Sequence, residues 1–167
     1  MKRILFTLLI FSTFSVVRAQ SSKHSLTTNH AGLNNKSGLK LELSINPALS
    51  IGRFGSEFVL GGEISLSRNF TPDMEGALSA GYTKFFYGHN NELIPVKAGM
   101  RYFLIPKIYL GAQAGVAFSP TDGGAYFIYS PTVGWKINNQ FDISLKYDHF
   151  SNEPSVLGFN LTYKIGL

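Results

Sequence analysis

The last eleven residues of the chain, 157–167, alternate between apolar side chains and small or polar ones. Since successive side chains of a strand point to opposite faces, this segment predicts a strand with one apolar and one polar face. Most of the chain repeats the pattern, which leaves too few polar faces for a water-exposed exterior. We therefore expect the apolar face to point outward and the polar face inward. The apolar positions are Leu157, Phe159, Leu161, Tyr163, Ile165 and Leu167.

Seven further segments carry the same alternation, and in the third of them it becomes irregular at 84–86, which predicts a bulge there. Tight connections at 72–73, 105–107 and 138–139 alternate with more variable ones, as they must if each set faces one side of a membrane. The sequence thus predicts an all-β fold, an eight-stranded antiparallel up-and-down transmembrane β-barrel over residues 39–167, with the tight turns in the periplasm. The seven segments are 39–45, 58–67, 75–86, 94–103, 108–118, 127–137 and 140–148.

The N-terminus predicts export. Lys2 and Arg3 precede an apolar run, and Ala19 lies where a small residue precedes a cleavage site, so residues 1–19 are expected to be a cleaved signal peptide. The run is shorter than the ~20 residues of a membrane-spanning helix. Residues 20–38 are polar and without period, which predicts a flexible arm. The formal net charge of +5 includes three cations of the signal segment, so the remaining chain gives no indication of nucleic-acid binding.

The inward positions of the predicted barrel carry both signs of charge. An eight-stranded barrel is narrow enough for side chains to fill it, so we expect paired charges and a closed lumen. The outward tyrosines and the single tryptophan, Trp135, are expected to form the aromatic girdles of a membrane protein. The charged inward residues are Lys40, Glu42, Glu63, Lys97, Arg101, Lys136, Asp142, Lys146, Asp148 and Lys164. The outward aromatic residues are Tyr82, Tyr102, Tyr129, Trp135, Tyr147 and Tyr163.

Several segments resemble a known family. Residues 92–103 with 107–112, 133–136 with 141–147, and 157–163 are similar to the small outer membrane protein β-barrel domain family, the PorT-like and OmpA-like barrels of Gram-negative bacteria. This resemblance covers roughly 39–167 and implies an outer-membrane location. It implies no particular activity and no catalytic residue. Outer-membrane lipids including lipopolysaccharide, and the barrel assembly machinery, are the partners it implies.

A second resemblance lies in residues 149–152. His149-Phe150-Ser151-Asn152 is similar to the His-x-Ser-Asn motif of PagL-like lipid A deacylases, in which an acidic residue of the following strand orients the histidine. His149 and Ser151 are two residues apart and are expected to share the lipid-facing side of the rim. The outward positions Leu157 and Phe159 are apolar, and Glu153 is close in sequence but is expected to lie in the loop. We expect no catalysis here, with lipid A deacylation by His149 and Ser151 as the alternative.

The remaining sequence carries no pattern typical of chemistry. Gly61-Gly62 and Gly123-Gly124 precede no helix, so they are not phosphate-binding loops. His24 and His30 share the polar arm and are expected to be solvated, with joint binding of a metal as the alternative. Asp73 and Glu75 flank a turn, and we expect them to serve that turn. We expect no cofactor, no metal and no catalytic residue, and a structural or surface-binding role without an open pore. A small-solute pore is the further alternative.

Overall fold

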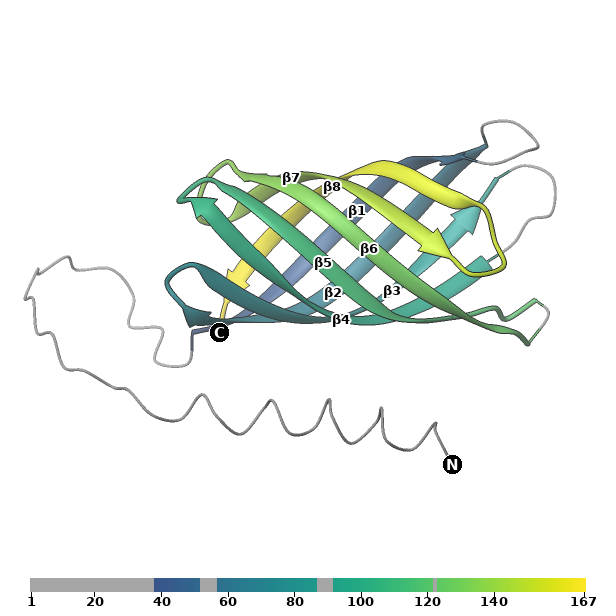
Figure 1. Cartoon of the computed structure of the whole chain (residues 1–167), viewed down its shortest axis with the longest axis horizontal. Coiled ribbons are helices and arrows are strands. Elements are labelled where there is room, and N and C mark those ends of the chain that lie inside the picture. Colours follow the sequence, from purple (N-terminus) through teal and green to yellow (C-terminus); the bar gives the residue numbers. More distant parts are fainter. Residues whose placement is uncertain (1–37, 52–56, 87–91, 122) are drawn as a thin grey trace, which may run out of the picture. The chain divides into compact units, whose positions relative to one another are not determined.

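The computed structural model describes residues 38–51, 57–86, 92–121 and 123–167. They form eight antiparallel strands in a closed barrel, in which each strand pairs with its neighbours in sequence and β1 also pairs with β8 (Figure 1). This confirms the predicted fold class. The strands are β1 (Leu39–Ile51), β2 (Phe58–Thr71), β3 (Met74–Phe85), β4 (Glu92–Ile105), β5 (Ile108–Phe118), β6 (Ala125–Lys136), β7 (Phe141–Phe150) and β8 (Ser155–Gly166).

The expected signal peptide, 1–19, lies outside the described residues. So does the expected arm, 20–38, except for Gly38. The described part of the chain contains no helix long and apolar enough to cross a membrane.

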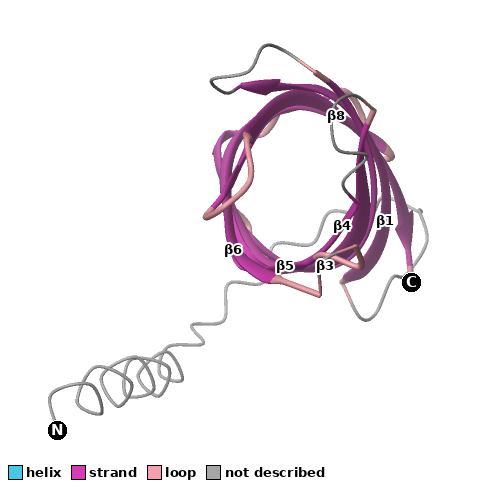
Figure 2. Cartoon of the chain, turned by 90° about the vertical axis from the view of Figure 1, so that its right-hand side faces the viewer, coloured by secondary structure: helices cyan, strands magenta, loops and turns pink. Residues whose placement is uncertain are grey.

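The barrel has two distinct ends. At the terminus end, β1 begins, β8 ends and the turns at 72–73, 106–107 and 137–140 connect neighbouring strands. At the opposite end, which we call the loop end, β1, β3, β5 and β7 end and β2, β4, β6 and β8 begin. Figure 2 shows the strands as a ring. Because the ring is closed, no strand presents unpaired backbone groups along an edge.

The predicted bulge at 84–86 is wrong. Pairing of β2 with β3 is continuous there, with Leu60 opposite Lys84 and Val59 opposite Phe85. Lys84 belongs to the outward face, where its Nζ lies 3.1 Å from Glu92 Oε1, and Phe85 points inward and is 3% exposed. The alternation looked irregular because the barrel interior is apolar near the loop end. There the inward residue, Phe85, is apolar and the outward residue, Lys84, is charged.

The outer surface is an apolar belt with aromatic residues near both ends. The six predicted outward aromatic residues all lie on this face. Tyr82, Tyr129 and Tyr147 lie in the halves of their strands nearer the loop end. Tyr102, Trp135 and Tyr163 lie in the halves nearer the terminus end. Aromatic residues toward both ends of the outer face are typical of a transmembrane barrel.

The cost of a charge on the belt should depend on its depth in the membrane. Leu161 lies in the middle of β8, whereas Leu110 is the third residue of β5, and both side chains are exposed on the belt. We expect Leu161→Arg to lower the free energy of unfolding in a phospholipid bilayer by about 2–4 kcal/mol, and Leu110→Arg by about 0–1 kcal/mol. Denaturant titration followed by Trp135 fluorescence measures both, with Leu161→Ala as the control for lost packing. Equal costs for the two arginines would contradict this placement of the membrane.

Candidate functional site

The interior near the terminus end holds a network of six charged side chains, which we call the terminus-end ion cluster. Arg101 lies at its centre and joins two strands, because its Nη2 is 2.7 Å from Glu42 Oε2 and its Nη1 is 2.8 Å from Glu75 Oε1. Both carboxylates are 0% exposed. The cluster comprises three anions, Glu42, Glu75 and Asp142, and three cations, Lys40, Arg101 and Lys164.

Two lysines and an aromatic ring complete this cluster. Lys40 Nζ lies 2.6 Å from Glu75 Oε2, and Lys164 Nζ lies 2.6 Å from Asp142 Oδ2. The Arg101 guanidinium also lies over the ring of the buried Tyr109, 5.5 Å from the ring centroid. A side chain at Gly134 would collide with that ring, so glycine makes room for Tyr109 on the neighbouring strand. Every charge therefore has a partner of opposite sign, which a buried charge requires.

A second network, the loop-end ion cluster, lies farther along the barrel. Glu63 Oε2 accepts hydrogen bonds from Lys97 Nζ at 2.9 Å and from Lys146 Nζ at 3.1 Å. Asp148 lies 3.5 Å from Lys146 and 3.8 Å from Lys97. The cluster has two cations and two anions, so it is neutral, as is the terminus-end ion cluster.

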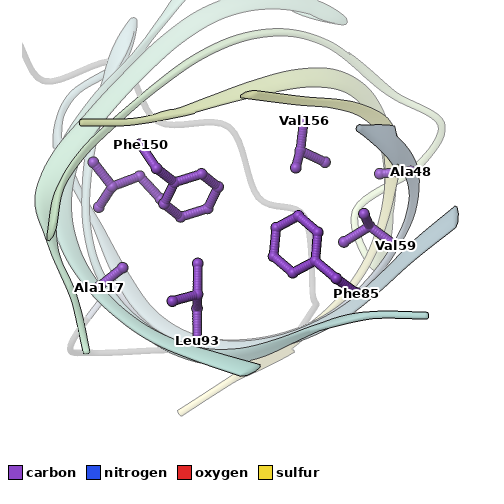
Figure 3. Close-up of a cluster of buried hydrophobic side chains, with 8 residues drawn as sticks. Ala48, Val59, Phe85, Leu93, Ala117, Phe150 and Val156 are labelled. Carbon is purple, nitrogen blue, oxygen red and sulfur yellow. The ribbon is translucent and has the colours of Figure 1, made fainter. Parts of the chain in front are cut away.

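An apolar plug fills the barrel between the loop-end ion cluster and the loops. Each of the eight strands contributes one side chain to it, and these side chains point into the lumen (Figure 3). Within it the rings of Phe85 and Phe150 meet edge to face, with ring centroids 6.5 Å apart at an angle of 66°. The plug comprises Ala48, Val59, Phe85, Leu93, Ala117, Ile128, Phe150 and Val156.

Little space remains inside the barrel. One cavity beside Asn46 and Asp148 has a volume of about 10 Å³, and another beside Arg101, Gln113 and Asn160 has a volume of about 20 Å³. These volumes are comparable to the space that one water molecule needs. Among the described residues, the side chains of the apolar plug and of the two ion clusters therefore lie within the ring of strands that Figure 2 shows.

The inward positions of all ten predicted charged residues are confirmed by strand parity, and nine of them belong to the two clusters. The tenth, Lys136, lies near the terminus end with its Nζ 6.0 Å from the centroid of the Phe103 ring. Glu75 was interpreted as a turn residue, and this was wrong because it is fully buried in the terminus-end ion cluster. The parity of β3, inward at Ala77 and Ser79, includes Glu75 and was the signal for it.

His149 lies on the outward face of β7 near the loop end, one residue before the strand ends, rather than in the loop. Its Nδ1 lies 2.8 Å from the Ser155 Oγ at the start of β8. The imidazole packs between two tyrosines, with its centroid 4.8 Å from the Tyr129 ring and 6.4 Å from the Tyr147 ring. Its observed hydroxyl partner is therefore Ser155, which the sequence pattern did not indicate.

Ser151 follows β7 in the exposed connection to β8, and its backbone N–H donates to the carbonyl oxygen of Phe127 at 3.0 Å. The position beside His149 Nδ1 that an acidic residue holds in a serine–histidine–acid triad is occupied by the Ser155 hydroxyl. A hydroxyl is uncharged, so it orients the imidazole without stabilising an imidazolium as a carboxylate does.

Other predicted positions carry no assembled chemistry. His24 and His30 lie outside the described residues. Within the described ranges, no group of three His, Cys, Asp or Glu side chains is arranged to hold a metal ion. Gly61-Gly62 lies inside β2.

Comparison with solved structures shows what class of protein this barrel belongs to. A de novo designed transmembrane β-barrel is 12% identical, covering 78% of this chain and 98% of its own, with a TM-score of 0.55. Neisserial surface protein A is 15% identical, covering 78% of this chain and 98% of its own, with a TM-score of 0.55. Ail, the attachment invasion locus protein of Yersinia pestis, is 14% identical over 75% of this chain and 98% of its own, with a TM-score of 0.54.

These similarities and the outward apolar belt define the chain as an eight-stranded transmembrane β-barrel. No protein-family model matches the sequence, and no curated protein matches it. The PorT-like and OmpA-like resemblance is thus supported at the level of the shared barrel fold.

The terminus-end ion cluster should be sensitive to loss of its central cation. Arg101→Leu leaves Glu42 and Glu75 buried without their closest shared partner, so we expect the free energy of unfolding to fall by about 3–5 kcal/mol. Adding Glu42→Gln should recover part of this loss, because it removes one uncompensated charge. Denaturant titration in detergent micelles measures both variants, with the exposed Lys107→Leu as control. Equal stability of Arg101→Leu and Lys107→Leu would contradict the assigned role of the cluster.

Proposed function

We propose that this chain is a small outer-membrane protein that conducts no solute and acts through its surfaces, as a structural or surface-binding barrel. The observation that carries the proposal is the closed interior, in which two neutral ion clusters and an apolar plug succeed one another along the barrel. A pore needs a continuous path for water, and the plug interrupts that path with apolar side chains. What remains available to a partner is the loop end and the outer surface.

The proposed location is the cell outer membrane, reached after removal of residues 1–19. Two observations support it: the basic and apolar N-terminal sequence, and a barrel fold shared with proteins that carry surface or outer-membrane names. Insertion by the barrel assembly machinery, and contact with outer-membrane lipids including lipopolysaccharide, are part of the same proposal. The tight turns at 72–73 and 106–107 then face the periplasm and the loop end faces outward.

The closed interior should give no steady conductance. We expect purified wild-type protein, reconstituted in planar bilayers, to leave the membrane current at its baseline over a wide range of voltages. The double variant Phe85→Ala/Phe150→Ala should remain silent as well, because the ion clusters still fill the barrel beneath the plug. A porin reconstituted in parallel controls for insertion. Reproducible single-channel steps in the wild type would overturn the proposal and favour the small-solute pore.

A second candidate function is ester hydrolysis at the rim, since His149 Nδ1 and Ser155 Oγ lie 2.8 Å apart where the outer leaflet would be. We propose that this pair is structural. Its imidazole is packed between Tyr129 and Tyr147, and its Nδ1 partner is uncharged, so it lacks the electrostatic support that a histidine base obtains from an acid.

Lipid A should therefore keep its acyl chains. We expect mass spectra of lipid A from cells expressing wild type, His149→Ala, Ser151→Ala and Ser155→Ala to be indistinguishable from those of cells with an empty vector. The serine variants separate the two hydroxyls that could act as the nucleophile. If the wild type removes one acyl chain and His149→Ala abolishes that removal, the protein is a lipid esterase.

A further inference from the structure

The lipid-facing surface of β1, β2 and β3 contains a hollow with a volume of about 640 Å³, which Leu161 and Tyr163 of β8 and Phe141 of β7 border on the other side. Two small residues create it, because Gly62 has no side chain and Ala80 on the neighbouring strand has only a methyl group. Larger apolar side chains surround these two positions, with Ile45 and Tyr82 directly opposite Gly62 on either side. The hollow lies within the apolar belt, so the molecules that can enter it are those of the membrane interior.

The barrel itself does not require glycine at position 62. A Cβ built there would have the Ser44 carbonyl oxygen, 3.9 Å away, as its nearest neighbour. At Gly99 and Gly115, by contrast, a Cβ would collide with the backbone of the adjacent strand. Gly62 thus leaves space on the membrane side that the protein does not fill.

A cation lies on the same face of the same strand. Arg68 follows Gly62, Ile64 and Leu66 along the outward positions of β2, and its side chain is exposed near the terminus end. No ion pair joins it to any of the described residues. An arginine at the edge of a lipid-facing surface is positioned to bind a phosphate group by charge-assisted hydrogen bonds.

The distance between Arg68 and the hollow matches the depth of one lipid leaflet. Gly62 and Arg68 are six residues apart on β2, which corresponds to about 20 Å along the strand. A strand tilt of about 35–45° reduces this to about 15 Å along the membrane normal. The hydrocarbon core of a bilayer is about 30 Å thick, so one leaflet contributes about 15 Å. A chain anchored at Arg68 therefore ends in the hollow.

We propose that β1, β2 and β3 bind one phospholipid, with its phosphate on the Arg68 guanidinium. One acyl chain lies across Leu66 and Ile64 and ends in the hollow at Gly62. Charge complementarity at Arg68 selects an anionic headgroup. This inference rests on the proposed orientation in the outer membrane and deepens the proposed contact with its lipids, and it holds whether or not the lumen conducts.

Native mass spectrometry of the full-length mature barrel in detergent tests the proposal, with palmitoyl-oleoyl phosphatidylglycerol titrated as the probe. We expect Arg68→Gln to weaken binding of the first lipid about fivefold, because one cation near the headgroup is lost. Gly62→Leu should weaken it by filling the hollow. Two matched variants elsewhere on the surface, Lys107→Gln and Ala114→Leu, should bind as the wild type does.

Faster migration of unheated samples on denaturing gels shows that each variant is folded. If Gly62→Leu does not fold, Ala80→Leu fills the same hollow in its place.

A second readout locates the acyl chain. In a Trp135→Phe background, a tryptophan introduced by Tyr82→Trp should be quenched by phosphatidylglycerol with brominated acyl chains, and Gly62→Leu should reduce the quenching. Wild-type affinity in both Arg68→Gln and Gly62→Leu would overturn the proposal. The proposal would also be overturned if these two variants bound lipopolysaccharide more weakly than the wild type but bound phosphatidylglycerol equally well. The lipid in the hollow would then come from the outer leaflet.

Discussion

In the hydrocarbon core of a bilayer, a backbone N–H or C=O has no water to bond, so every such group needs a partner within the protein. A sheet meets this condition only by closing on itself, and here the closure is made by β1 and β8. Leu41 is opposite Leu66 of β2 on one side and opposite Ile165 of β8 on the other. This ring of hydrogen bonds fixes which side chains face lipid and which are enclosed. The composition of the interior follows from it.

Charged side chains enclosed in the barrel can form ion pairs only with one another. The two clusters satisfy this condition separately, since each contains equal numbers of cations and anions. The pairs also connect strands that are distant around the ring, because Arg101 of β4 reaches Glu42 of β1. Such pairs are therefore cross-links through the lumen as well as neutral fillings. Toward the loop end the same space is filled by the apolar plug, which needs no partners beyond close packing.

The alternation of side chains was enough to predict the number of strands, their order and the inward faces of residues such as Glu42 and Lys97. It was not enough to predict contacts across the lumen, because these depend on the stagger between strands, which no single segment specifies. Phe85 was misjudged because an inward apolar residue beside an outward lysine reverses the expected pattern. The contact of His149 with Ser155 was missed for a related reason. It depends on where β8 begins, and the sequence pattern placed that start two residues later.

A filled interior limits where any binding can occur. Side chains inside an eight-stranded barrel contact one another, so a substitution there changes the stability of the barrel rather than the binding of a partner. On the outer face the choice of side chain is less restricted, since any apolar residue is compatible with contact with lipid. The missing side chain at Gly62 is therefore not explained by folding alone, nor is the charge at Arg68, which forms no ion pair with the residues that the structure describes. Both lie on one face of one strand, a leaflet's depth apart, and a single bound lipid accounts for the two together.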